Sequence, residues 1–127
     1  MTAKEIQKYS KFTVAALKRI AVKHFHKFIR ERDKDKPCVS CGRFTTLQAG
    51  HFHSAGRCER LRFNEDNVHG QCLKCNFYEQ QSDTNYRQEI EKRIGKERLS
   101  VIDFIASIKT PYKTDRFFLI EIILKYK

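Results

Sequence analysis

Residues 61–76 read LRFNEDNVHGQCLKCN and contain Cys72 and Cys75, two cysteines separated by two residues. Cys38 and Cys41 form an earlier pair with the same spacing. One tight turn can present both thiolates of such a pair to a single ion, and four thiolates satisfy tetrahedral zinc. We therefore predict a structural zinc site that unites the two pairs and stabilises a region too small to fold by burial alone. The alternative is that the cysteines are reduced and packed as small hydrophobic side chains.

The segment between the two cysteine pairs predicts short strands. It is rich in His, Gly and Asn, and its apolar pieces are brief, at residues 44–47 and around Phe52. Such pieces suit two short strands better than a helix, and the pattern turns helical after Cys72. Cys58, also in this segment, is expected to be a free thiol. The predicted fold class is α+β, with a zinc-braced strand-strand-helix centre over residues 37–82.

Residues 1–36 are predicted to hold a long basic amphipathic helix that ends near Lys36, because Pro37 disfavours helix at the preceding residue. The apolar side chains fall within one arc of this helix: Val14, Leu17, Ala21, Phe25, Phe28 and Ile29. The basic side chains gather on the other side: Arg19, Lys23, Lys27 and Arg30. Lys18 falls inside the apolar arc, where it must extend to solvent or mark the edge.

Residues 83–127 are predicted to form C-terminal helices. One ends at Gly95, which supplies a C-terminal stop, and a second spans residues 96–108. The last is apolar nearly all round over residues 117–124, so it must be buried, either in its own core or against a second subunit. The candidate N-caps are Asp83 or Thr84 for the first of these helices and Thr114 or Asp115 for the last.

Length and charge limit the class of protein. A chain of 127 residues has room for one domain, and its net charge of +11 favours an acidic partner. Nucleic acid is the commonest such partner, although anionic lipid or a ribosome would fit the charge alone. No secretion signal and no apolar run long enough to span a membrane are visible, so we expect an intracellular protein with no membrane partner and with reduced thiols.

Histidines and asparagines around the cysteines are suited to phosphodiester hydrolysis. That reaction needs a base to deprotonate water and a divalent cation to neutralise charge on the phosphate. Neutral histidine suits the first task, and oxygen ligands such as asparagine suit magnesium for the second.

The sequence resembles the NinG or Rap family of lambdoid phages, recombination nucleases that act selectively on branched DNA. The resemblance rests on DKDKPCVSCG at residues 33–42, on the Ala49-Gly50-His51 step and on the block at residues 61–76. It extends to FIRERD at residues 28–33 and EKRIGKER at residues 91–98, and covers roughly residues 25–127. A more distant resemblance is to the HNH or His-metal finger endonucleases, including the phage endonuclease VII resolvases.

The distant resemblance implies a role for three residues. His51 would be the general base, Asn67 would brace the loop that orients it, and Asn76 would bind a catalytic magnesium or manganese ion. The acidic ligand usual before the base is replaced here by Gly50. Either Asn76, water and substrate phosphate hold the ion, or another side chain contributes, with weak metal affinity expected without DNA. The candidates for that contribution are His53, His69 and Glu79.

These resemblances imply a metal-dependent endonuclease that cuts Holliday junctions and displacement loops in the cytoplasm of a phage-infected or prophage-bearing bacterium. Because a four-way junction has near two-fold symmetry, we expect a homodimer joined through the apolar last helix. The alternative is a zinc-ribbon DNA-binding accessory protein of recombination without catalysis, and a third interpretation is an RNA-binding zinc ribbon. The expected DNA contacts are Arg19, Lys23, Lys27, Arg30, Arg57, Arg60 and Arg62.

Overall fold

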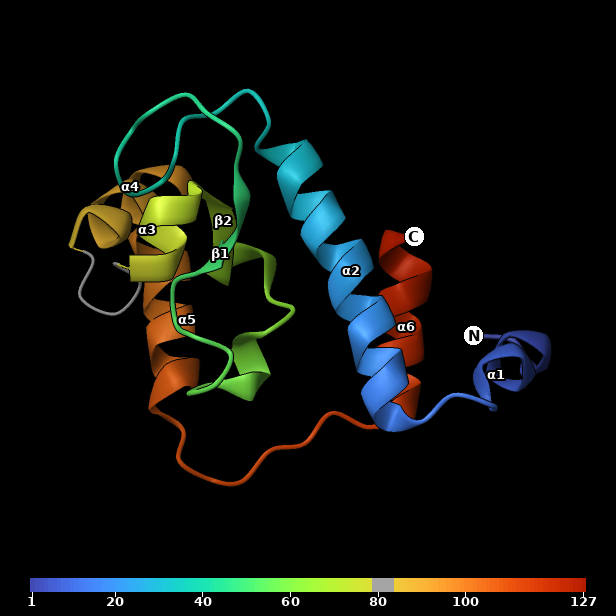
Figure 1. Cartoon of the computed structure of the whole chain (residues 1–127). Coiled ribbons are helices and arrows are strands. Elements are labelled where there is room, and N and C mark those ends of the chain that lie inside the picture. Colours follow the sequence, from blue (N-terminus) through green and yellow to red (C-terminus); the bar gives the residue numbers. More distant parts are fainter. Residues whose placement is uncertain (79–83) are drawn as a thin grey trace.

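The structure is a computed structural model, in which residues 1–78 and 84–127 are described. It combines a two-stranded antiparallel sheet with helices, as expected for a mixed α+β chain (Figure 1). The helices are α1 (Ala3–Tyr9), α2 (Val14–Arg32), α3 (Leu73–Tyr78), α4 (Thr84–Ile94), α5 (Lys96–Ser107) and α6 (Arg116–Tyr126). The strands are β1 (Gln48–His51) and β2 (Val68–Gln71), and the loop between them contains the short 3-10 helices η1 (Glu59–Leu61) and η2 (Glu65–Asn67).

The predicted amphipathic helix is present, but it is shorter than residues 1–36. α2 begins at Val14 because the Thr13 hydroxyl accepts a hydrogen bond from the Ala16 amide, and α1 is a separate helix before it. α2 ends at Arg32, because the next side chain, Asp33, turns inward and accepts a hydrogen bond from the Gly70 amide. Four residues of the predicted apolar arc are buried: Leu17, Ala21, Phe25 and Ile29. Val14 is exposed, and Lys18 pairs with Glu59.

The apolar last helix is buried in the chain's own core, one of the two arrangements expected for it. α6 lies alongside α2 (Figure 1). Its buried residues, Leu119, Ile120, Ile122 and Ile123, join those of α2 in one cluster. Asp115, one of the two candidate caps, accepts a hydrogen bond from the Phe118 amide.

A second core lies beneath α4 and α5. Tyr86, Ile90, Leu99 and Ile102 pack there with the loop between the strands and with the first cysteine turn. Gly95 separates the two helices with φ +88°, a conformation that favours glycine, which confirms the predicted stop. α5 ends at Ser107, one residue before the predicted limit. Of the two candidate caps of α4, Asp83 lies outside the described residues.

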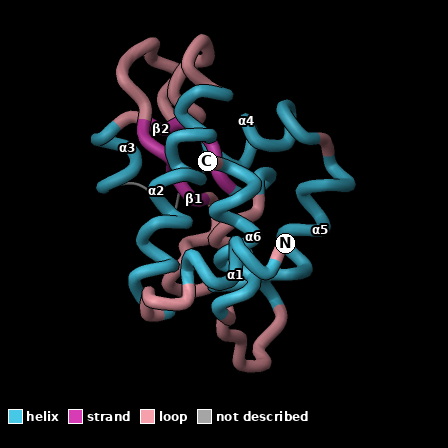
Figure 2. Tube along the Cα trace, turned by 90° about the vertical axis from the view of Figure 1, so that its right-hand side faces the viewer, coloured by secondary structure: helices cyan, strands magenta, loops and turns pink. Residues whose placement is uncertain are grey.

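The strands do not lie where the apolar pieces predicted them. Residues 44–47 are not a strand, and Phe44 is exposed, whereas β1 covers the next four residues and stops before Phe52. β2 covers a segment in which no strand was predicted, and pairs Gln48 with Gln71 and His51 with Val68. The apolar pieces did not locate the strands. The strands are defined by their backbone pairing, and the sheet that they form lies between the two cores. Figure 2 shows both strands enclosed among helices.

Candidate functional site

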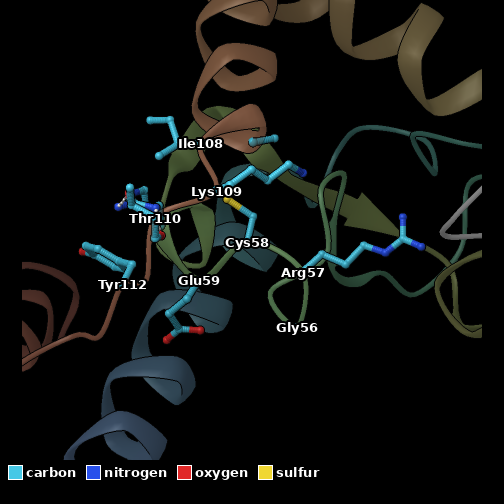
Figure 3. A pocket seen from close by; sticks show the side chains of 10 residues that line it. Gly56, Arg57, Cys58, Glu59, Ile108, Lys109, Thr110 and Tyr112 are labelled. Carbon is cyan, nitrogen blue, oxygen red and sulfur yellow. Dashed lines mark hydrogen bonds between the residues drawn. The ribbon is translucent and has the colours of Figure 1, made fainter.

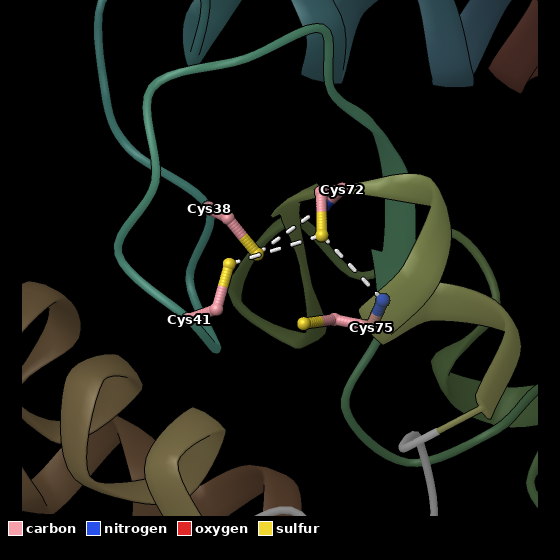
Figure 4. A group of neighbouring side chains, drawn as sticks. All are labelled: Cys38, Cys41, Cys72 and Cys75. Atoms are coloured by element: carbon pink, nitrogen blue, oxygen red, sulfur yellow. Dashed lines mark hydrogen bonds between the residues drawn. The ribbon is translucent and has the colours of Figure 1, made fainter.

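The two cysteine pairs meet in one cluster, which confirms the predicted juxtaposition (Figure 4). The Sγ atoms of Cys38, Cys41, Cys72 and Cys75 all lie within 4.8 Å of one another. The first pair lies in the turn after α2, and the second lies at the start of α3. Within the described ranges 1–78 and 84–127, no other group of three or more His, Cys, Asp or Glu side chains is placed to hold a metal ion.

The surroundings favour the thiolate form of Cys41 and Cys72, whereas burial raises the pKa of Cys38 and Cys75. The Arg43 guanidinium donates to the Sγ atoms of Cys41 and Cys72, at 3.5 and 3.6 Å. Burial opposes ionisation of Cys41, but hydrogen bonds, chiefly from Arg43, outweigh it and lower the pKa of this thiol to about 6. The Cys72 amide donates to Cys38 Sγ at 3.2 Å. Four converging sulfurs with such donors fit a structural zinc ion. Cys58 is buried in the second core, outside the cluster.

His51, the predicted base, lies at the end of β1 with its ring toward α2. Its Nε2 is 3.1 Å from the carbonyl oxygen of Arg62. A carbonyl can only accept, so Nε2 carries the proton and Nδ1 holds the free lone pair. Burial lowers the pKa of His51, with a smaller opposing effect from the Arg62 hydrogen bond. His51 is therefore neutral at pH 7, as a general base must be.

A second histidine, His26, faces His51 and was not predicted. The ring centroids of His26 and His51 are 5.7 Å apart. Burial, with smaller effects from His51, Arg30 and Arg62, lowers the pKa of His26 to about 4. Its position in the sequence was the available signal. His26 is three residues after Lys23 and four before Arg30, so it lies on the side of α2 that carries the basic side chains. We call these side chains the basic stripe of α2: Arg19, Lys23, Lys27 and Arg30.

Asn67 is fully buried and ties together the loop between the strands. Its Oδ1 accepts from the His53 amide at 2.8 Å, and its Nδ2 donates to the carbonyl oxygens of His53 and Leu61 at 3.0 and 3.3 Å. The Phe52 amide donates to the Asn67 carbonyl oxygen. This network holds the backbone directly after His51.

Asn76, the expected cation ligand, lies on the opposite face of the sheet from His51. Its Nδ2 donates to Gln48 Oε1 at 3.0 Å. Gln48 and His51 are three residues apart in β1, so their side chains point to opposite faces. Ala49, on the His51 face, packs with α2. One ion bound by Asn76 would therefore reach the His51 face only around an edge or an end of the sheet.

Gly50 has a structural reason for lacking a side chain. A Cβ atom there would lie 2.1 Å from Gln71 Oε1 and 2.8 Å from Gln71 Cβ. The Tyr86 hydroxyl donates to the Gly50 carbonyl oxygen at 2.6 Å, and this bond holds the strand against α4. An aspartate at this position would thus need the Gln71 side chain of β2 to move. Gln71 Oε1 is itself buried and has no hydrogen-bond partner in the described part of the chain.

The residues expected to replace the missing acid have other partners. His53 Nε2 lies 2.8 Å from Asp103 Oδ1, and Arg87 pairs with the same carboxylate. His69 is buried, with Nε2 2.9 Å from the Asp66 carbonyl oxygen and Nδ1 3.4 Å from Arg32 Nη2. Burial lowers the pKa of His69 to about 4. Glu79 lies outside the described residues.

The seven predicted DNA contacts divide into two groups. Arg19, Lys23, Lys27, Arg30 and Arg57 are exposed. Arg60 and Arg62 are half-buried and held by the protein: Arg60 binds Thr110, and Arg62 pairs with Glu59. The cations on α2 are therefore exposed to solvent, whereas Arg62 contacts His51 through its carbonyl oxygen and lowers the pKa of His51 through its charge.

A family model described as the bacteriophage lambda NinG protein matches residues 3–127. The chain belongs to the NinG family. The NinG protein of Escherichia phage lambda is 46% identical over 78 residues, which cover 60% of this chain and 38% of that protein. The NinG protein of Salmonella phage P22 is 43% identical over 82 residues, covering 63% of this chain and 39% of that protein. The matched region thus spans about two fifths of these relatives' length. No solved structure matches the chain.

In this NinG chain, no helix among the described residues is long and apolar enough to cross a membrane.

The cysteine cluster and His51 are joined through the sheet. The Val39 amide of the first cysteine turn donates to the Gly70 carbonyl oxygen in β2, and β2 pairs with β1 up to His51. A zinc ion bound by the cysteines would thereby stabilise the strand that carries the histidine.

Proposed function

We propose that this NinG chain is a metal-dependent endonuclease that cuts branched DNA, with His51 as the general base. The observation that carries the proposal is the contact of His51 Nε2 with the Arg62 carbonyl oxygen. It leaves Nδ1 as the proton acceptor of a neutral imidazole on a surface rich in positive charge. A histidine in that state can take a proton from the attacking water.

The residues around His51 support this chemistry in different ways. Asn67 holds the loop after the base, and Glu59 holds the Arg62 side chain. Arg30 lies close enough to His26 for its charge to lower the pKa of that histidine, and the neutral His26 ring faces His51, so a phosphate held at Arg30 would lie near the base. The general base of such a reaction contributes about a hundredfold to ten-thousandfold in rate.

The proposed reaction also needs a divalent cation at the phosphate. A bound magnesium or manganese ion would neutralise charge on the phosphate and on the leaving oxygen. Glu59, the acidic group whose charge acts on His51, already pairs with Lys18 and Arg62. Asn76 lies on the other face of the sheet. The described side chains near His51 therefore do not form a cation site alone, and we expect the ion to bind weakly unless DNA phosphates supply ligands.

The zinc ion has a structural role in this proposal, and a second copy of the chain acts on the same junction. Zinc at the four cysteines would be structural, since all four positions of a tetrahedral ion are taken by protein. We also propose that two copies act on one junction, as its near two-fold symmetry favours. The apolar face of α6 is buried within the chain, so a dimer would need another surface. Sedimentation of the protein with a four-way junction tests the number of copies bound.

The test is cleavage of an end-labelled four-way junction and its matched linear duplex by the zinc-loaded protein. Magnesium, manganese and no added cation are compared, because a strong chelator would also remove zinc. We expect metal-dependent cuts confined to the junction and lost in His51→Ala. His24→Ala, a histidine on α2 outside the contact with His51, is the matched control and should retain cleavage.

A second candidate function is DNA binding without catalysis. The observation in its favour is the packing of Gly50 against Gln71, which excludes a carboxylate beside the base. Binding to the junction without cuts in either cation, by protein with full zinc content, would establish this function and overturn the first.

A further inference from the structure

A cavity of about 300 Å³ lies beside the histidine site, between the loop at residues 56–60, the end of α5 and the segment at residues 108–112 (Figure 3). Its volume is at the lower end of the range for ligand pockets, which suits a small ligand. None of its lining residues belongs to the cysteine cluster or to the expected cation ligands.

One wall of the cavity is an aromatic ring that is held in place without being buried. The Arg60 guanidinium donates to the carbonyl oxygen and to Oγ1 of Thr110, both at 3.0 Å. The same guanidinium lies 4.8 Å from the centroid of the Tyr112 ring. Tyr112 nevertheless remains 39% exposed. A ring fixed in this way loses little conformational freedom when a planar group stacks on it.

The charges around the cavity favour an anion. The carboxylate of Glu59 is neutralised by Lys18 and Arg62. Arg57 and Lys109 also line the cavity, and neither takes part in an ion pair with a described residue. The Lys109 and Arg57 side chains extend on the side of the cavity away from Tyr112 (Figure 3). The cavity therefore presents an aromatic ring at one end and two cations at the other, a combination that can bind a nucleotide through its base and its phosphate.

The cavity and His51 are linked through the loop between β1 and β2. Glu59 lines the cavity and accepts a hydrogen bond from Arg62 Nε at 2.8 Å, and the Arg62 carbonyl oxygen contacts His51. A nucleotide in the cavity would thus lie next to the DNA strand bound at His51. Continuous duplex keeps its bases stacked and paired, whereas a branch point supplies a base that can leave the stack at lower cost.

We propose that this cavity binds one unpaired nucleotide of branched DNA, with its base against Tyr112 and its phosphate at Arg57 and Lys109. The inference rests on the proposed function, because it assumes DNA at His51. It adds a means by which the protein distinguishes a branch from continuous duplex.

The test measures binding alone, by fluorescence anisotropy, with zinc-loaded His51→Ala protein so that cleavage cannot interfere. The probes are a duplex with one unpaired nucleotide, the same duplex with an abasic unit at that position, and the fully paired duplex. We expect preference for the unpaired nucleotide over full pairing, and about a tenfold loss of that preference in Tyr112→Ala. Tyr112→Phe keeps the aromatic ring and should retain the preference for the unpaired nucleotide. Phe104→Ala, which removes an exposed aromatic side chain outside the cavity, is the control.

The outcomes separate this inference from the proposed function. If the abasic probe binds like the fully paired duplex, base stacking is supported. If it binds as well as the unpaired base, or if Tyr112→Ala keeps the full preference, the cavity proposal is overturned while DNA binding stands. A parent protein that binds none of the probes overturns both. Zinc content and circular dichroism confirm that each variant is folded.

Discussion

The Nε2 atom of His51 lies 3.1 Å from the carbonyl oxygen of Arg62. Two residues that are 11 positions apart in sequence thus meet across the loop between β1 and β2. The backbone oxygen orients the imidazole, while the Arg62 guanidinium is turned away to Glu59. This relationship defines which histidine nitrogen can accept a proton.

Cleavage should already be at its full rate at neutral pH. Burial lowers the pKa of His51 from its usual 6.5, so the base remains deprotonated until the pH falls below that value. The rate should be level above about pH 6.5 and should fall in more acidic solution. The measurement is the cleavage rate at saturating junction, with zinc content and DNA binding checked at each pH. A rate that keeps climbing well above pH 7 would contradict the assignment.

Gly50→Ala should destabilise the protein by about 1 to 3 kcal/mol, because the added Cβ overlaps Gln71 in a closely packed region. Gly56→Ala is the matched control, since nothing lies within 4 Å of a Cβ at that position. Urea unfolding of the zinc-loaded proteins gives both values. Equal stability of the two variants would show that Gln71 can move aside, and an acidic residue at position 50 would then be tolerated.

Zinc should be bound at one ion per chain and lost with any cysteine of the cluster. Cys72→Ser removes a thiolate and should release zinc and destabilise the sheet, which the first cysteine turn joins at Val39. Cys58→Ser alters a buried cysteine outside the cluster and should retain zinc. Metal content by mass spectrometry distinguishes them. Zinc loss in both variants, or in neither, is the result that this prediction excludes.

The stripe on α2 should set the salt dependence of DNA binding. Lys23→Ala combined with Lys27→Ala removes two exposed cations, so the slope of log affinity against log salt should become shallower by about two. Lys92→Ala with Lys96→Ala removes the same charge at exposed positions of α4 and α5. Titration of a junction at several salt concentrations compares the pairs. If both pairs change the slope equally, binding depends on net charge and not on the stripe.

Asp33→Asn should cost about 2 kcal/mol of stability at neutral pH. Burial would raise the pKa of Asp33, but the Arg32 guanidinium and the Gly70 amide together hold it at about 2, below the usual 3.8. A depressed carboxylate pKa stabilises the fold above about pH 4, and this contribution is lost as the pH falls toward 2. Urea unfolding at pH 7 is the measurement, with the exposed neighbour Asp35→Asn as the control. An equal effect of the two substitutions would remove Asp33 from the link between α2 and β2.

Features that depend on neighbouring residues could be predicted from the amino-acid sequence. The buried face of α2, the stop at Gly95 and the cap at Asp115 each follow from side chains within one or two helical turns. The cysteine cluster spans a longer distance, but the two-residue spacing within each pair made it recognisable. In these cases the chemistry that holds the feature is visible in the sequence itself.

Only the tertiary structure could decide the rest. The sheet lies between two cores, so its strands are defined by the Gln48–Gln71 and His51–Val68 pairing and not by apolar runs. The same pairing places Asn76 and His51 on opposite faces and leaves no room for a side chain at Gly50. His26 became a site residue because α2 packs against β1. Each of these results depends on contacts between distant segments, whose geometry no local pattern specifies.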